Sequence, residues 1–221
     1  LQPSEYILVA DVKNYTDNAV FDHSLTEELR VSIRQSPRIN LFPPERTFDA
    51  LKRMNMTDKQ SLSESVAVIV AKREGIQVVV AGSVDQLGTG YLLSCKIIDA
   101  VKGEIMRLIR RKASGIEQVL PEMDRLSEDI RHSLGESLEE ISAYAMSLEP
   151  VTTSSLEALR AYGQALKIRS TKAEAAAIPF FQQAIDKDPN FALAYARLGI
   201  VYSNVGRPAD AKASLRKAFD L

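Results

Sequence analysis

The stretch AYARLGIVYSNVGRPADAKASLRKAF, residues 194–219, decides the fold of the C-terminal third of the chain, because part of its pattern occurs twice. Small and large apolar residues recur there after 34 residues: Ala177, Phe181 and Ala184 are matched by Ala211, Leu215 and Ala218. A fixed period of this length is typical of solenoids built from helical hairpins. Small residues suit the points where two helices cross closely, and one large residue fills the gap between them.

The segment 192–221 resembles a tetratricopeptide repeat. The bulky, leucine, glycine and tyrosine positions of its first helix are held by Tyr195, Leu198, Gly199 and Tyr202, and Pro208 opens its second helix. The preceding unit, 155–190, matches more weakly, since the same positions are Ala161, Gln164, Ala165 and Ile168. Such a departure suits an end-capping or junction repeat. Because a stable array usually has about three repeats, we expect either further repeats after Leu221 or a cap formed by the first domain.

Composition and charge exclude some classes of function. The 221 residues are 45% hydrophobic and 26% charged, as in soluble globular proteins, and the net charge of −1 argues against a nucleic-acid binder. Residues 151–221 hold 10 Lys and Arg against 6 Asp and Glu, a balance of +4, while residues 1–150 have a balance of −5. This asymmetry indicates two units of different character.

The sequence contains neither a membrane-spanning pattern nor a targeting pattern. No apolar run approaches the ~20 residues of a membrane helix. The chain begins at Leu1 without a signal-like segment, which suggests a piece of a longer protein whose targeting information, including any membrane anchor, is missing.

Residues 1–112 mix strand and helix patterns, which predicts a mixed sheet covered by helices. The expected strands are 6–12, 39–42, 77–84, 91–100 and 104–112, with glycine turns joining the last three. The expected helices are 24–33, 45–54 and 61–73, followed by a long helix over 116–148 that Gly135 interrupts. Ser-x-x-Glu capping patterns begin at four serines: Ser24, Ser61, Ser137 and Ser154. The predicted class is therefore α+β: a domain over 1–148, a linker over 149–153 and an all-α region over 154–221.

The first domain also resembles a known type. YILVADVKNYTD, GIQVVVAGSV and YLLSCKIIDAVKGEI are similar to the TolB N-terminal-like α+β domain, and SLEALRAYGQAL resembles the phrase that joins this domain to tetratricopeptide repeats. This combination is typical of the C-terminal region of bacterial Ser/Thr protein kinases and CadC-like regulators. The resemblance implies a sensor or interaction module on the extracytoplasmic side of a membrane-anchored bacterial parent.

No pattern in the sequence predicts catalysis, a cofactor or a metal. Gly88 and Gly90 lie between two strands, without the Lys-Ser/Thr of a phosphate-binding loop. His23 and His132 are far apart, and neither has a partner at helical metal-site spacing. The single cysteine, Cys95, lies in an apolar run and is expected to be buried and inert. Kinase signatures are missing from this sequence.

The loop 11–22 is the candidate ligand loop, because it follows a buried strand where mixed sheets tend to bind ligands. The side chains that offer oxygen atoms to a ligand are Asp11, Asn14, Thr16, Asp17 and Asn18. The spacing lacks the glycine and terminal glutamate of a calcium loop. Local turn and capping hydrogen bonds explain the same residues, so both interpretations stay open.

On the tetratricopeptide template, a partner groove is lined by Leu193, Ala196, Arg197, Ile200, Ser203 and Asn204. Family members that grip a terminal carboxylate place lysine and asparagine at groove positions, and Ala196 and Ile200 argue against that mode here. The positive balance favours an acidic partner segment with Arg197 as its main contact. The alternative is that this repeat only packs against further repeats.

The sequence thus predicts a non-enzymatic regulatory or sensor module that binds a protein or peptide through its repeats. One alternative is a small-ligand sensor that uses the loop 11–22 to control a kinase or winged-helix output domain. Another is a scaffold that forms homo-oligomers through its long helix and repeats.

Overall fold

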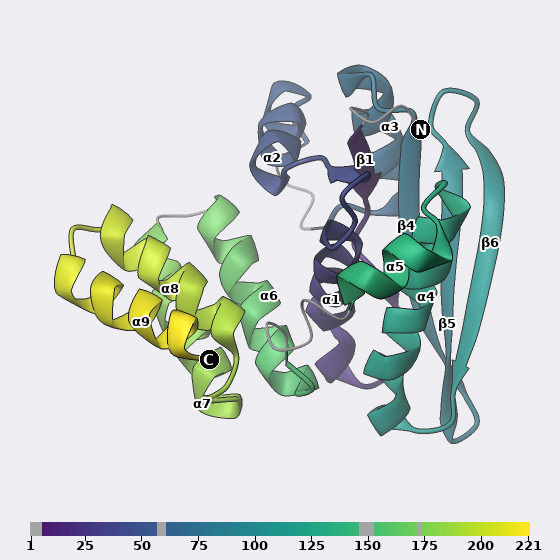
Figure 1. The fold of residues 1–221 in the computed structure, drawn as a ribbon. Helices are drawn as coiled ribbons and strands as arrows, with labels where there is room; N and C mark the ends of the chain where they lie inside the picture. Colours follow the sequence, from purple (N-terminus) through teal and green to yellow (C-terminus); the bar gives the residue numbers. More distant parts are fainter. Residues whose placement is uncertain (1–5, 57–60, 146–152, 172–173) are drawn as a thin grey trace. The chain divides into compact units, whose positions relative to one another are not determined.

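The structure is a computed structural model, and it describes residues 6–56, 61–145, 153–171 and 174–221. The chain divides into two compact units, Leu1–Met146 and Ser147–Leu221. The first combines a sheet with helices, and the described part of the second is helical (Figure 1). The predicted α+β class is confirmed.

The sheet of the first unit has the strand order β3-β1-β4-β5-β6, and β2 also pairs with β4. The strands are β1 (Tyr6–Val9), β2 (Lys13–Asn14), β3 (Asn40–Leu41), β4 (Val78–Leu87), β5 (Gly90–Asp99) and β6 (Glu104–Ala113). The pairs among β1, β2, β3 and β4 are parallel, whereas β4–β5 and β5–β6 are antiparallel. The sheet is therefore mixed, as the sequence predicted.

The first strand is shorter than the predicted 6–12, because the chain leaves the ladder after Val9. The backbone amide of Asp11 donates to the carbonyl of Leu62, and its carboxylate accepts from the Leu62 amide at 2.8 Å. The amide of Val12 donates to the hydroxyl of Thr26. These tertiary bonds replace the strand pairing, and the chain rejoins β4 only at β2.

Two predicted hairpins are confirmed. Leu87 pairs with Gly90 across a two-residue turn in which Gly88 has a φ of 63°. Gly103 has a φ of 77° in the turn before β6. Both glycines adopt the left-handed conformation that other residues disfavour, so Gly88 serves a turn and not a phosphate site.

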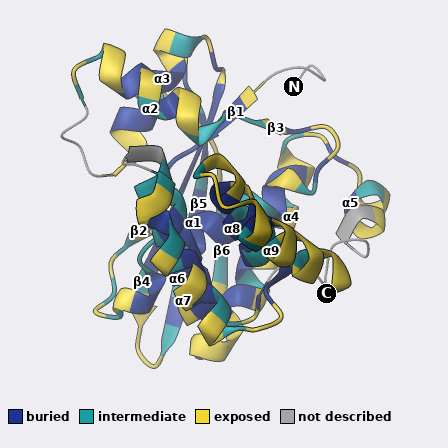
Figure 2. Cartoon of the chain, turned by 90° about the vertical axis from the view of Figure 1, so that its left-hand side faces the viewer, coloured by how far each residue is buried: buried dark blue, intermediate teal, exposed yellow. Residues whose placement is uncertain are grey.

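Helices cover both faces of the sheet (Figures 1 and 2). They are α1 (Ser24–Arg34), α2 (Pro44–Arg53), α3 (Glu64–Glu74), α4 (Val119–Ser133) and α5 (Leu138–Ala145), with 3-10 turns at Ala19–Phe21 and Ile116–Gln118. Buried residues of α2 and α3 form one core with Leu8, Val79 and Ile98. Helix α4 packs against α1 and lies on the other face, where Asp129 binds Arg111 of β6. The predicted long helix is interrupted at Gly135 (φ 101°), and residues 146–148 lie outside the described ranges.

Three of the four capping predictions are wrong. Ser24 lies inside α1 and donates to the carbonyl of Val20, and α3 begins at Glu64, three residues after Ser61. Helix α6 (Leu156–Thr171) is capped by Ser155, not Ser154, since the hydroxyl of Ser155 accepts from the amide of Ala158. The prediction for Ser137 and Glu140 is confirmed: each side chain accepts a bond from the backbone amide of the other.

The described part of the second unit consists of α6, the 3-10 turn Glu174–Ala177, α7 (Ile178–Lys187), α8 (Ala192–Asn204) and α9 (Pro208–Asp220). Helix α6 packs with α7 and α8 with α9 as two hairpins. The core of this unit contains three aromatic rings: the centroid of Tyr162 lies 5.7 Å from that of Phe181 and 5.0 Å from that of Phe191. Phe181 is fully buried, whereas Leu215, one period later, is 44% exposed. The first hairpin is thus covered more completely than the second, and residues 149–152 of the predicted linker lie outside the described residues.

Candidate functional site

Helix α8 carries all six predicted groove residues on one face. At about 100° per residue, they occupy an arc of roughly 120° around the helix. The opposite side is buried and includes Ala194, Leu198, Val201 and Tyr202. The face itself is more open: its first three members are half-buried, whereas Ile200, Ser203 and Asn204 are exposed. The helix therefore presents one mixed apolar and polar face outside its own core.

Arg197 is the only charged residue of α8. Its Nε atom is buried without a hydrogen-bond partner, and its guanidinium has no ion pair with any residue that the structure describes. A buried donor without an acceptor costs free energy. A partner carboxylate at the terminal nitrogens of the guanidinium would neutralise its charge, although it could not reach the buried Nε.

Packing and hydrogen bonds fix the orientation of α8. Tyr202 accepts a hydrogen bond from Gln182 of α7 at 3.0 Å, and the guanidinium of Arg207 lies 4.5 Å from the centre of its ring. Gly199 lies against Leu215 of α9. The residues that the family pattern specifies therefore hold the helix, and Arg197 is not among them.

The polar side chains of the loop 11–22 form hydrogen bonds mainly within the loop and with neighbouring residues. The Asn14 side chain donates to Asp22 and to the carbonyl of Asn18, and it accepts from the amide and hydroxyl of Thr16. The structure thus brings Asn14, Thr16 and Asn18 together. Asp17 is exposed on the same loop, and no hydrogen bond joins it to the described residues.

Asp11 belongs to a different network from the rest of this loop. Its carboxylate lies 3.1 Å from Arg30 of α1, which also binds Glu27 at 2.6 Å. Burial opposes the charge of Arg30, but Glu27 and Asp11 raise its pKa. Asp11 therefore ties β1 to α1 and to the segment before α3, which is a structural use of its carboxylate.

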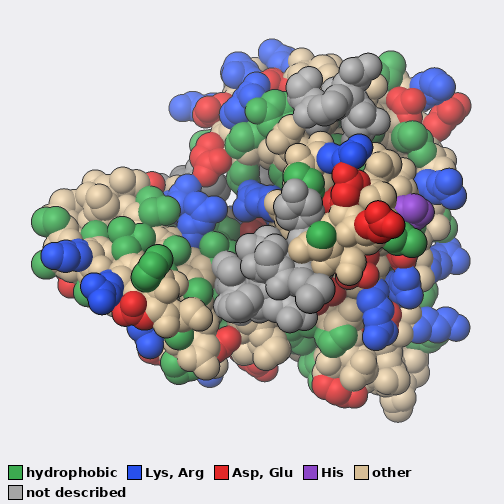
Figure 3. All heavy atoms as spheres, viewed as in Figure 1, with side chains coloured by type: hydrophobic (Ala, Val, Ile, Leu, Met, Phe, Trp, Pro, Cys, Tyr) green, Lys and Arg blue, Asp and Glu red, His purple; other side chains and the backbone are tan. Residues whose placement is uncertain are grey.

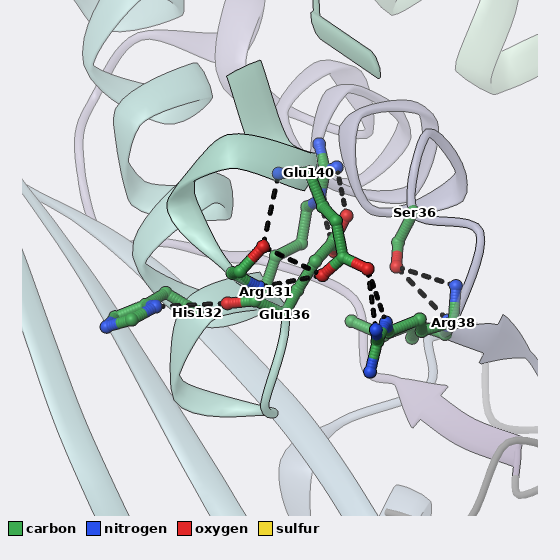
Figure 4. Close-up of polar contacts among 8 residues, drawn as sticks. Ser36, Arg38, Arg131, His132, Glu136 and Glu140 are labelled. Carbon is green, nitrogen blue, oxygen red and sulfur yellow. Dashed lines mark hydrogen bonds and ion pairs between the residues drawn. The ribbon is translucent and has the colours of Figure 1, made fainter. Parts of the chain in front are cut away.

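A buried ion pair, which the sequence did not reveal, joins the two ends of the α4–α5 turn (Figure 4). Arg131 binds Glu136 through two hydrogen bonds of 2.9 and 2.6 Å, and their side chains are 2% and 0% exposed. Burial acts to raise the pKa of Glu136, but hydrogen bonds from Arg131 and Ser36 and the charge of Arg131 lower it. His132 is exposed, as expected, and its Nδ1 lies 3.0 Å from the carbonyl oxygen of Glu136.

A second buried carboxyl group lies between α1 and α4. The hydroxyl of Ser32 is 3.3 Å from Glu28 and 3.0 Å from Asp124. Burial, followed by the charge of Asp124 and a hydrogen bond with it, raises the pKa of Glu28 well above its ordinary value. Neighbouring carboxyl groups disfavour a second negative charge, so Glu28 holds a proton over a wider pH range than a free glutamate.

The described residues do not meet the requirements of a reactive cysteine, a metal site or a membrane helix. Cys95 is fully buried, as predicted, and burial raises the pKa of its thiol to about 12. Among the residues that the structure describes, no three His, Cys, Asp or Glu side chains gather in a way that could hold a metal ion. None of the described helices combines the length and the hydropathy needed to cross a membrane.

Comparison with known proteins identifies part of the second unit. A tetratricopeptide repeat family model matches residues 180–213, from within α7 to within α9. The resemblance of this region to a tetratricopeptide repeat is therefore confirmed. No curated protein matches the chain.

Several solved structures are similar to the chain. The LpoB C-terminal domain from Escherichia coli is 21% identical, with 52% of this chain and 85% of that chain covered and a TM-score of 0.47. Lipoprotein GNA1162 from Neisseria meningitidis is 15% identical, with coverages of 60% and 98% and a TM-score of 0.42. TolB from Acinetobacter baumannii is 14% identical, with coverages of 61% and 29% and a TM-score of 0.39.

Proposed function

We propose that this chain is a non-enzymatic regulatory module whose repeat helices bind an acidic segment of a partner protein along α8. The tetratricopeptide match at residues 180–213 supports a protein-interaction role. The observation that carries the proposal is Arg197, a cation without an ion pair among the described residues, on a helix with no other charge. Ile200 beside it supplies exposed apolar surface, and Ser203 and Asn204 supply hydrogen-bonding groups.

The test is a binding assay with labelled peptides. Fluorescein-labelled eight-residue peptides with one or two glutamates in an apolar background are titrated with the full chain, and anisotropy is measured. Arg197→Gln is expected to weaken the best binder about tenfold, as loss of a charge-assisted hydrogen bond does. Asn204→Ala is expected to weaken it less, because a neutral hydrogen bond contributes less.

Lys212→Gln is the matched control, since Lys212 is exposed on α9 outside the groove face. It removes the same charge from the same unit. Equal losses in Arg197→Gln and Lys212→Gln would show attraction to overall charge and would contradict a groove on α8.

A sensor role for the loop 11–22 cannot be tested at Asp11. Asp11 binds Arg30 and the amide of Leu62, so its removal alters the fold as well as any ligand site. Asp17→Asn is the cleaner test, because Asp17 is exposed. A small molecule that raises the melting temperature of the full chain but not of Asp17→Asn would support this function.

A scaffold role has one observation in its favour. Phe219 is 88% exposed on α9, one helical turn from Leu215, which is 44% exposed. Two such residues on one helix form an apolar surface that self-association would bury. Sedimentation analysis of the full chain and of Phe219→Ser tests this role, and it predicts a smaller species for the variant.

The place of the module in a larger protein also belongs to the proposal. The resemblance of YILVADVKNYTD and SLEALRAYGQAL to bacterial sensor regions supports a parent that carries a kinase or winged-helix output domain. It also supports an extracytoplasmic position. Sequencing the coding region on both sides of this segment tests both statements.

A further inference from the structure

Strand β6 forms an edge of the sheet in the described part of the chain, where it pairs only with β5. It is ten residues long, which is long for an edge strand. Along such an edge, alternate backbone amides and carbonyls point away from the sheet without a partner strand. Natural proteins protect edges of this kind by shortening or covering them, by bulges or by charged side chains.

Apolar side chains on β6 are exposed. Ile105 is 54%, Met106 57% and Leu108 47% exposed, whereas Ile98, which pairs with Ile105 on the neighbouring strand, is buried. Exposed apolar residues that lie together mark surfaces that another molecule covers. Strand β6 thus combines an open backbone with apolar side chains.

The strand is also strongly basic. Four of its ten residues are cations, against Glu104 alone. Arg111 is bound to Asp129 of α4 at 2.7 Å, whereas Arg107, Arg110 and Lys112 have no ion pair with the described residues. Lys and Arg side chains also follow the right-hand margin of Figure 3, where Figure 1 places β6.

The register of β6 defines where a new strand fits. A bulge at Met106 disturbs the ladder, and the stretch from Arg107 to Lys112 then pairs regularly with β5. Side chains alternate between the faces of a sheet, so Leu108, Arg110 and Lys112 lie on one face. An added strand would place its own alternate side chains opposite these three.

We propose that β6 accepts an extended segment of a partner protein as an additional strand, and that this segment alternates apolar with acidic residues. Backbone hydrogen bonds supply the pairing, and acidic side chains opposite Arg110 and Lys112 supply the selectivity. This surface belongs to the first unit and is independent of the function proposed for α8.

Charge argues against a second copy of this chain as the occupant. Two-fold antiparallel pairing centred on Ile109 or on Arg110 places an arginine of one copy opposite an arginine of the other. Like charges directly opposite one another destabilise a strand pair. Centring the pair on Leu108 brings the bulge at Met106 into the new ladder.

The experiment uses the full chain and a fluorescein-labelled, acetylated and amidated eight-residue peptide that alternates valine with glutamate. We expect saturable binding by anisotropy and slower hydrogen exchange at the outward amides of β6. The variant Arg110→Glu/Lys112→Glu is expected to weaken binding about tenfold, since two favourable cross-strand pairs become repulsive. The matched control Lys52→Glu/Lys72→Glu changes two exposed lysines on α2 and α3 and is expected to have no effect.

Two further controls separate this site from other modes of binding. A peptide N-methylated along one edge keeps its charge but loses hydrogen bonds, and it is expected not to bind. Arg197→Gln is expected to leave binding unchanged. The proposal is wrong if the N-methylated peptide binds equally well, if Arg197→Gln abolishes binding, or if anionic vesicles bind to β6 and the peptide does not. It is also wrong if Arg110→Glu/Lys112→Glu only makes the chain self-associate, since the cations then protect the edge.

Discussion

Leu215 lies directly against Gly199. A Cβ atom at position 199 would stand 2.7 Å from Cγ of Leu215 and 3.2 Å from the carbonyl oxygen of Ala211. Helices α8 and α9 lie side by side (Figure 1), so close together that a side chain at position 199 would have to displace Leu215. This contact explains in physical terms why a glycine stands at that point of the repeat.

Gly199→Ala is expected to destabilise the second unit, although alanine is the better helix former. The substitution gains about 1 kcal/mol in helix propensity. Overpacking against Leu215 and the Ala211 carbonyl costs about 1–3 kcal/mol, and the cost should prevail. Urea denaturation followed by circular dichroism measures the change in the free energy of unfolding.

A double-mutant cycle supplies the control. Leu215→Ala removes the side chain that Gly199→Ala would meet, so the loss caused by alanine at 199 should shrink in the double variant. Additive losses would show that Leu215 and Gly199 are not coupled. A Gly199→Ala variant more stable than the parent would contradict the contact itself.

The repeat could be predicted because its signal is local and periodic. Ala177, Phe181 and Ala184 are matched after 34 residues by Ala211, Leu215 and Ala218, and the structure buries all three residues of the first set. The helix starts could not be predicted equally well. The Ser-x-x-Glu pattern at Ser24 is local too. However, the hydroxyl of Ser24 donates to the carbonyl of Val20, and Ser24 is the first residue of α1 and not its cap.

Arg131→Met is expected to destabilise the first unit strongly, because it leaves the buried carboxylate of Glu136 without its partner. Breaking a buried pair from one side costs about 3–5 kcal/mol. Arg131→Met/Glu136→Leu should recover most of the loss, since an apolar pair of similar volume leaves no buried charge without a partner. Chemical denaturation of the single and double variants measures both values, and equal losses in the two would contradict this explanation.

Arg131 and Glu136 also show why the buried polar groups could not be predicted. Glu136 follows Arg131 by five positions, and this spacing alone does not distinguish a buried pair from a solvated one. Glu28 and Asp124 are on different helices that only the fold brings together. The sequence likewise predicted a strand over 104–112, but the position of β6 at the edge of the sheet follows from the strand order.

Cys95 is expected to resist alkylation in the folded chain. The thiolate is the reactive form, and burial raises the pKa of this thiol to about 12. Iodoacetamide at neutral pH should modify Cys95 only after denaturant unfolds the protein, as mass spectrometry can show. Rapid modification without denaturant would mean that β5 opens readily.

Glu28→Gln is expected to stabilise the first unit increasingly as pH rises. In the folded chain the pKa of Glu28 lies well above the ordinary value of 4.5, because of burial first and of Asp124 second. The folded state therefore binds a proton that the unfolded state releases. The stability that this proton supplies is complete below pH 4.5 and is lost as pH rises through the folded pKa.

Glutamine keeps the neutral donor without a proton to lose, so the difference in free energy of unfolding between Glu28→Gln and the parent should grow above pH 4.5. Urea denaturation at several pH values measures this difference. Glu128→Gln is the matched control on α4, because Glu128 is exposed, and its difference from the parent should stay flat. Asp124→Asn should lower the pKa of Glu28 and move the pH dependence of the parent towards acid. Parallel curves for Glu28→Gln and the parent across this range would show that Glu28 is ionised in the folded chain.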